Sequence, residues 1–145
     1  MPRAGRLFAN IMRRRELNEP EGRLDEVARR VVDAAFEVHR TLGAGFAESV
    51  YEHALAVELV LRGILFERQV PISITYKETE VGDGRLDLLV EGCLVVELKA
   101  VEALMPVHVA QVVSYLRASR RSLGLLITFN VPQFRQGVRR VIASI

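Results

Sequence analysis

Cysteine is almost absent from this chain of 145 residues, since Cys93 is the only one. One cysteine excludes an intramolecular disulfide framework and a zinc site built from several cysteines. Cys93 falls in an apolar, strand-like stretch, where a buried and unreactive thiol is the expected role.

Long apolar runs are missing as well. No stretch approaches the ~18 consecutive apolar residues that a membrane-spanning helix requires, and no signal-peptide pattern opens the chain. We therefore expect a soluble, cytoplasmic protein without a membrane partner. Half of the residues are hydrophobic, which is enough for the core of one domain of ordinary size.

Excess charge is also small, because the formal net charge is only +2. That value does not predict nucleic-acid binding by itself. The arginines nevertheless gather in clusters, at residues 13–15, 29–30, 117–121 and 135–140. The planar guanidinium suits phosphate, although each cluster is also compatible with a solvated surface.

Hydrophobic periodicity predicts one α/β domain over residues 21–145, preceded by a flexible basic arm over residues 1–20. Helical spacing predicts helices over about residues 24–42, 47–62 and 106–117. Strand patterns cover about residues 64–76, 84–90, 94–100 and 122–130. This order, α-α-β-β-β-α-β, is typical of a sandwich with a mixed central sheet flanked by helices.

Two segments carry more specific expectations. Pro71 lacks a backbone donor, so it marks an edge position, a bulge or a break in the first β segment. Residues 77–84 are predicted to form a polar turn. The segment after residue 130 stays open between a short helix and a strand.

Three ionisable residues interrupt the apolar hairpin predicted over residues 84–100. Asp87 lies on the first arm, and Glu97 and Lys99 lie on the second. Glu97 and Lys99 are two residues apart and project from one face of a strand, and a matching register would bring Asp87 beside them. Leu86, Leu88 and Val90 alternate along the first arm, so we expect their side chains to lie together on one face of it.

Charged groups inside a sheet are costly unless they are paired, solvated or bound to a metal. Two converging carboxylates suit Mg²⁺, or Mn²⁺, with waters and substrate phosphate as further ligands. Lys99 would then orient or deprotonate water, or meet charge that grows on the phosphate. A solvated edge or a simple ion pair is the alternative for these residues.

The pattern resembles the PD-(D/E)XK nuclease superfamily, with Asp87 as its aspartate and Glu97-Leu98-Lys99 as its E-x-K motif. More narrowly, it resembles the GxxExxY proteins, whose signature stands here at Gly45–Tyr51. The resemblance covers about residues 24–143. It implies a metal-dependent nuclease that hydrolyses phosphodiester bonds of DNA, or alternatively RNA.

The resemblance also implies roles for single residues. Asp87 and Glu97 would bind the metal, with the backbone carbonyl of Leu98 and the carboxylate of Glu48 as further ligands. Lys99 would be the catalytic lysine. The alternative for Glu48 is a favourable charge at a helix N-terminus.

The third predicted helix carries a polar stripe of His108, Gln111 and Tyr115. The resemblance implies that Gln111 reaches the active site, where it would hydrogen-bond Lys99, a water or a phosphate. His108 and Tyr115, together with Arg85, are assigned to substrate binding. A solvated polar face is the alternative.

Two further residues complete the resemblance. Tyr51 is expected to pack or to orient Glu48, one helical turn away. The proline of the superfamily motif is absent, because Leu86 precedes Asp87.

Two other functions stay open from the sequence. One is a non-catalytic module that binds nucleic acid or protein on the same scaffold. The other is an oligomeric structural protein in which the polar residues form a buried network. A core of this size would also suit a homo-oligomer, because one copy offers little surface to grip a duplex.

Overall fold

The computed structural model describes residues 20–144. The predicted arm over residues 1–20 therefore lies outside the described residues, apart from Pro20. The described elements follow the predicted order and add a final strand. They are α2 (Pro20–Leu42), α3 (Glu48–Leu61), β1 (Phe66–Tyr76), β2 (Thr79–Val90), β3 (Leu94–Lys99), α4 (Pro106–Ala118), β4 (Leu123–Thr128), the 3₁₀ turn η1 (Phe134–Gly137) and β5 (Val138–Ile142).

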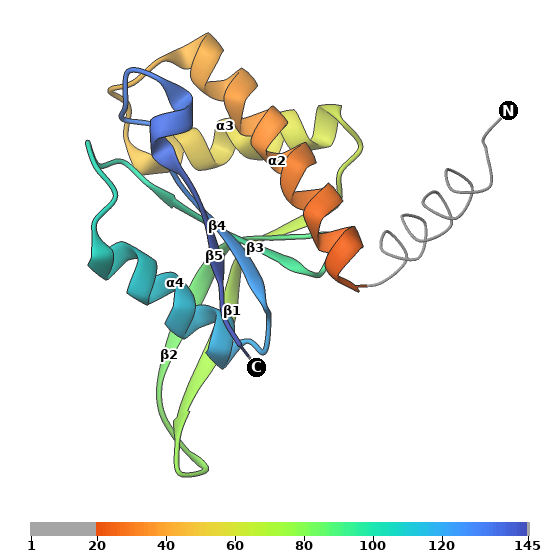
Figure 1. The fold of residues 1–145 in the computed structure, drawn as a ribbon, viewed down its shortest axis with the longest axis vertical. Helices are drawn as coiled ribbons and strands as arrows, with labels where there is room; N and C mark the ends of the chain where they lie inside the picture. Colours follow the sequence, from red (N-terminus) through yellow and green to blue (C-terminus); the bar gives the residue numbers. More distant parts are fainter. Residues whose placement is uncertain (1–19, 145) are drawn as a thin grey trace, which may run out of the picture.

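The five strands form one mixed sheet in the order β1-β2-β3-β4-β5. Only β3 and β4 pair in parallel, with α4 as the connection between them, and the other neighbours are antiparallel. Helices α2 and α3 cover one face of the sheet and α4 lies on the other (Figure 1). The predicted α/β fold with a mixed sheet between helices is confirmed.

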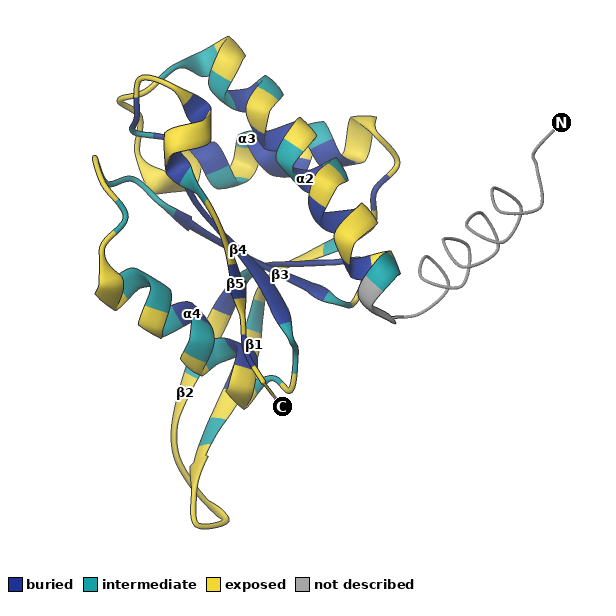
Figure 2. Cartoon of the chain, viewed as in Figure 1, coloured by how far each residue is buried: buried dark blue, intermediate teal, exposed yellow. Residues whose placement is uncertain are grey.

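Two apolar cores fill the space between these layers, one on each face of the sheet. The larger core joins α2 and α3 to the sheet, and the smaller one joins α4 to the opposite face. Strands β3 and β4 are buried on both faces, whereas the outer sides of the helices are exposed (Figure 2). No helix within residues 20–144 combines the length and hydrophobicity that crossing a membrane requires.

The hairpin of β1 and β2 is longer than predicted. Only Lys77 and Glu78 form its turn, both with positive φ, and β2 begins at Thr79, so the predicted polar turn over residues 77–84 is wrong. Polar side chains obscured this strand because the far end of the hairpin extends into solvent, where no core enforces alternation (Figure 2). Pro71 lies on the edge strand β1, as its missing donor predicted.

Strand β2 changes the face that it buries at Asp87. Leu88 and Val90 belong to the core under α2 and α3, whereas Leu86 belongs to the core under α4. The predicted common face of Leu86, Leu88 and Val90 is therefore wrong at Leu86. A regular strand would keep residues two apart on one face, so the exception marks a local break in the sheet.

Candidate active site

The regular pairing of the sheet is interrupted at Asp87. The pairing of β1 with β2 omits Gln69 opposite Asp87, although pairs on both sides of them are present in the same register. The pairing of β2 with β3 begins only at Leu88. Asp87 thus lacks a regular ladder partner on either neighbouring strand, and at this interruption it meets Glu97.

Side-chain hydrogen bonds replace the ladder between β2 and β3 at this point. The backbone N–H of Asp87 donates to Oε1 of Glu97 over 3.1 Å, and the backbone N–H of Leu98 donates to Oδ2 of Asp87 over 2.8 Å. Each carboxylate therefore binds the backbone of the opposite strand. The structure brings Asp87 and Glu97 together, as the hairpin register suggested.

This pair concentrates negative charge in a poorly solvated place. Glu97 is only 3 % exposed. Burial, followed by the charge of Asp87, raises the pKa of Glu97 to about 8. Burial also raises the pKa of Asp87, against the hydrogen bond from Leu98. Each carboxylate therefore holds its proton to a higher pH than an ordinary carboxylate does, and the charge of Asp87 contributes to the shift of Glu97.

Lys99 projects from β3 on the same face as Glu97. Its Nζ donates to Oε1 of Gln111 on α4 over 2.8 Å, so the predicted hydrogen bond between them is present. Positive charge on Lys99 favours the ionised form of Glu97. Gln111 accepts this hydrogen bond through a neutral amide, so the contact fixes the place of the amine and adds no charge beside the carboxylates.

Glu48 is the first residue of α3 and is exposed. Partial burial, followed by the charge of Asp87, raises the pKa of Glu48, while Lys99 lowers it. Glu48 thus lies within the field of the site. Within residues 20–144, however, no three His, Cys, Asp or Glu side chains are grouped closely enough to hold a metal ion, so its role as a ligand stays a prediction.

The donor set fits a divalent cation that keeps several waters. Asp87 and Glu97 meet where the regular pairing of β2 with β3 stops, and burial raises the pKa of both carboxylates, so a bound cation would offset the cost of ionising them there. Mg²⁺ commonly uses one or two protein carboxylates, with waters and substrate oxygens for the rest. Leu98 could contribute only its backbone carbonyl, because its side chain is hydrocarbon and has no donor atom.

The turn before α3 explains the signature at Gly45–Tyr51. Gly45 has φ +112°, a conformation that favours glycine. The hydroxyl of Tyr51 donates to the carbonyl of Gly43 over 2.6 Å and accepts from the N–H of Phe46 over 3.2 Å. Tyr51 therefore holds the loop that positions Glu48, rather than binding Glu48 itself.

We expect Tyr51→Phe to lower the free energy of unfolding by about 1–3 kcal/mol, because it leaves two backbone groups of this loop without their partner. The ring would keep its stacking on Phe129, 4.5 Å between centroids. Urea unfolding measures the effect. Tyr76→Phe, at an exposed tyrosine of β1, is the matched control, and equal stability of both variants would contradict this role of Tyr51.

The residues assigned to substrate binding lie around this centre in different settings. His108 caps α4, since its Nδ1 accepts from the N–H of Met105 over 2.9 Å. The ring of Tyr115 lies 3.3 Å from where a Cβ on Gly84 would stand, so it packs on β2. Arg85 is exposed on β2. Their contact with substrate stays a prediction.

Sequence reasoning missed two residues beside the carboxylates. The amide of Gln69 donates to Oε1 of Glu52 over 2.6 Å and approaches Oδ1 of Asp87 at 3.4 Å. Glu52 comes one helical turn after Glu48, so the spacing on α3 contained a signal for it. The sequence contained no such signal for Gln69, because the position of this residue beside Asp87 depends on the pairing of β1 with β2.

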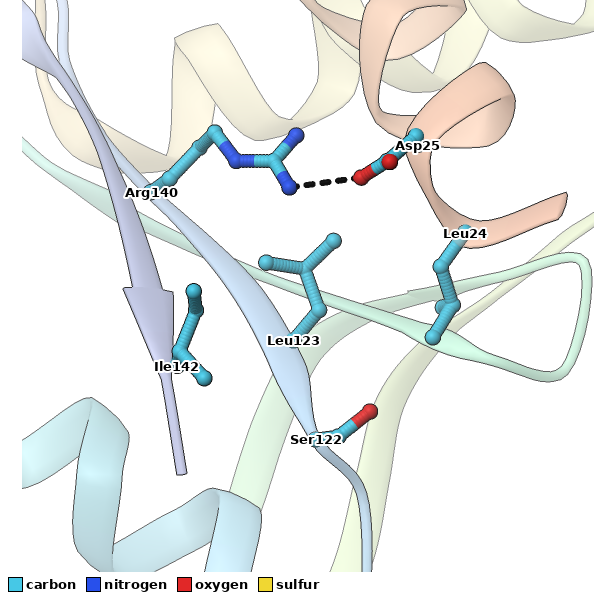
Figure 3. Close-up of a pocket in the computed structure, with 6 residues that line it drawn as sticks. All are labelled: Leu24, Asp25, Ser122, Leu123, Arg140 and Ile142. Carbon is cyan, nitrogen blue, oxygen red and sulfur yellow. Dashed lines mark hydrogen bonds and ion pairs between the residues drawn. The ribbon is translucent and has the colours of Figure 1, made fainter. Parts of the chain in front are cut away.

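A separate pocket of about 250 Å³ lies between α2, β4 and β5 (Figure 3). The two charged residues of this pocket pair with each other, since Arg140 donates to Oδ1 of Asp25 over 2.6 Å. Leucine and isoleucine side chains supply most of the remaining lining. This pocket lacks the paired carboxylates that Asp87 and Glu97 provide, so the site at Asp87 remains the better candidate.

Comparison with known proteins identifies the family of the chain. The family model described as PD-(D/E)XK nuclease superfamily matches residues 25–141, which include most of α2, all of α3 and the positions of Asp87, Glu97 and Lys99. No curated protein and no solved structure matched the chain. The matched region spans most of the sequence, and the chain belongs to the PD-(D/E)XK nuclease superfamily.

Proposed function

We propose that this protein is a metal-dependent nuclease, of the GxxExxY group, that hydrolyses phosphodiester bonds of DNA with Mg²⁺ or Mn²⁺. One observation carries the proposal: Asp87 and Glu97 meet where the sheet opens, next to a lysine held by Gln111. Members of this superfamily are typically nucleases. RNA is the alternative substrate.

In this proposal Asp87 and Glu97 hold the cation, with Glu48 and the Leu98 carbonyl as further ligands. When bound, the cation supplies positive charge to the phosphate and makes water easier to deprotonate. Lys99 orients the attacking water and stabilises charge that grows on the phosphate. Water loses a proton to solvent as it attacks phosphorus, while the bond to the leaving sugar oxygen breaks and that oxygen takes up a proton from solvent. Gln111 positions the Lys99 amine for this work.

Substrate would be held by its backbone rather than by its bases. Arg85 lies two residues before Asp87 on an exposed part of β2, and His108 lies one helical turn before Gln111. Contacts of this kind neutralise phosphates without reading sequence. We include a homodimer in the proposal, because a second copy would extend the surface available to a duplex.

Divalent-ion binding and cleavage test the proposal together. The parent protein is expected to bind Mn²⁺ in calorimetry and to cut labelled single- or double-stranded DNA or RNA only when Mg²⁺ or Mn²⁺ is present. Asp87→Asn should weaken Mn²⁺ affinity at least about tenfold, because it removes ligand charge. Asp83→Asn, at an exposed aspartate of the same strand, is the matched control. Unchanged affinity in Asp87→Asn would exclude Asp87 as a ligand.

A non-catalytic binding module is the second candidate. It is favoured by one observation, namely that residues 20–144 contain no cluster of three metal-binding side chains. A module of this kind would bind nucleic acid or protein equally well with and without divalent ions. Affinity that is indifferent to Mg²⁺, together with no cleavage by the parent protein, would favour it.

A further inference from the structure

Gln69 has an unusual backbone conformation for its place in the fold. It has φ +52° inside strand β1. The other non-glycine residues with positive φ within residues 20–144 lie in turns or directly after a helix, namely Lys77, Glu78, Glu91 and Arg120. The backbone of Gln69 is therefore strained within a strand, where no turn requires a positive φ.

Neither the sheet nor burial explains this conformation. A left-handed backbone is unfavourable for glutamine, and glycine would adopt it readily. Gln69 is exposed, so no core packing forces the side chain into place. Strain that is kept in this way is common at functional sites, where the side chain has a task that glycine could not perform.

The contacts of the side chain indicate that task. The amide nitrogen of Gln69 carries two protons, and it faces two carboxylates: Oε1 of Glu52 at 2.6 Å and Oδ1 of Asp87 at 3.4 Å. Glu52 is itself fixed, because Nη2 of Arg68 donates to its other oxygen over 2.9 Å. The amide therefore links α3 to the aspartate at the opening of the sheet.

We infer that Gln69 is a positioning residue that sets the orientation of the Asp87 carboxylate, with Glu52 and Arg68 as its anchor. The Leu98 N–H holds Oδ2 of Asp87, and the Gln69 amide approaches Oδ1. Contacts at both oxygens restrict rotation of the carboxylate about its Cβ–Cγ bond. This inference rests on the proposed function, because the orientation matters for a ligand of a cation.

A simple clamp between β1 and α3 would be the alternative role. The two roles differ in what glycine does at this position. Glycine relieves the backbone strain and removes the amide, so a positioning residue would lose function without losing stability. A clamp would lose stability and leave the affinity for a cation unchanged.

The experiment compares Gln69→Gly with Lys77→Gly in the full chain. Lys77 has φ +47° in the β1–β2 turn, so its variant reproduces the backbone relief, and the contact that it removes is with the ring of Tyr76, 5.5 Å from the amine to the ring centroid, rather than with the carboxylates. We expect both variants to keep or raise the Tm of the metal-free protein, by roughly 3 °C at most. Only Gln69→Gly should lose Mn²⁺ affinity in calorimetry, about tenfold, and lower kcat more than it raises KM.

The outcomes separate the claims. If Gln69→Gly binds Mn²⁺ as tightly as the parent protein does, whatever its Tm, the positioning role is overturned and the proposed function stays in place. No Mn²⁺ binding by the parent protein would instead reject the proposed function. If Gln69→Gly fails to fold, Gln69→Asn replaces it, because asparagine tolerates positive φ and its amide is one methylene shorter. That variant should fold with weakened Mn²⁺ affinity, and unchanged affinity would again overturn the inference.

Discussion

Lys99→Ala is expected to reduce Mg²⁺-dependent cleavage by about 10²–10⁴-fold, the range found when a group that moves a proton or stabilises transition-state charge is removed. The amine lies on β3 beside Glu97 and is held at 2.8 Å by Gln111. Only the tip of this half-buried side chain is assigned to chemistry, so the fold and most of the Mn²⁺ affinity should persist. Single-turnover cleavage measures the effect.

Lys77→Ala provides the control for this variant, because Lys77 is the only other lysine of the sequence and lies at the far turn of the β1–β2 hairpin. It removes the same charge and should cut like the parent protein. The cleavage rate of Gln111→Ala should lie between those of Lys99→Ala and Lys77→Ala, because this change frees the Lys99 amine without removing it. If Lys99→Ala cuts as fast as the parent, the role given to Lys99 is wrong.

The metal-free protein is expected to lose stability as pH rises. Glu97 has a folded pKa of about 8 against an ordinary value of 4.5, so the folded state binds more protons than the unfolded state between these values. The free energy of unfolding must then fall across this pH window, and Asp87, whose pKa is also raised, adds in the same direction. Since one pKa unit corresponds to about 1.4 kcal/mol, we expect a loss of at least that size between pH 5.5 and 8.

Glu97→Gln removes the titrating group that is mainly responsible for this loss of stability with rising pH. In EDTA at pH 8 this variant should be more stable than the parent protein, and its stability should vary less with pH. Mn²⁺ should stabilise the parent by mass action and have little effect on the variant. Urea unfolding at several pH values measures both, with Glu67→Gln on the exposed edge strand as the matched control. A parent protein whose stability rises from pH 5.5 to 8 in EDTA would contradict this account of Glu97.

Sequence patterns predicted the elements that a core enforces. The three helices and the strands up to β4 carry apolar periodicity because each buries a face. The sequence did not decide between helix and strand for β5, because the segment VRRVI holds two exposed arginines. The strand also pairs along one side only, with β4. The far end of β2 was missed for a related reason, since solvent there removes the need for alternation.

The carboxylate pair was predictable because the turn at Glu91 and Gly92 sets the register of the hairpin. Val90 pairs with Leu94, and the same register carried three residues further places Asp87 opposite Glu97. The break in the sheet was not predictable, because it arises from hydrogen bonds between side chains and the backbone of another strand. A period-two pattern assumes an unbroken ladder.

Tertiary contacts also decided the residues around the pair. Gln69 and Glu52 are 17 residues apart in the chain and meet only because β1 passes the start of α3. The signature tyrosine could be located from the sequence, but its partners could not, since Tyr51 binds the backbone of the preceding loop.

A crystal structure of the protein soaked in Mn²⁺ tests the central claim most directly, because the anomalous signal of the ion identifies its position. We predict one Mn²⁺ bound by the carboxylates of Asp87 and Glu97 where the sheet separates, with the Lys99 amine beside it. Mn²⁺ found only elsewhere on the molecule at saturating concentration, with both carboxylates still bound to the backbone as in the metal-free protein, would contradict the account.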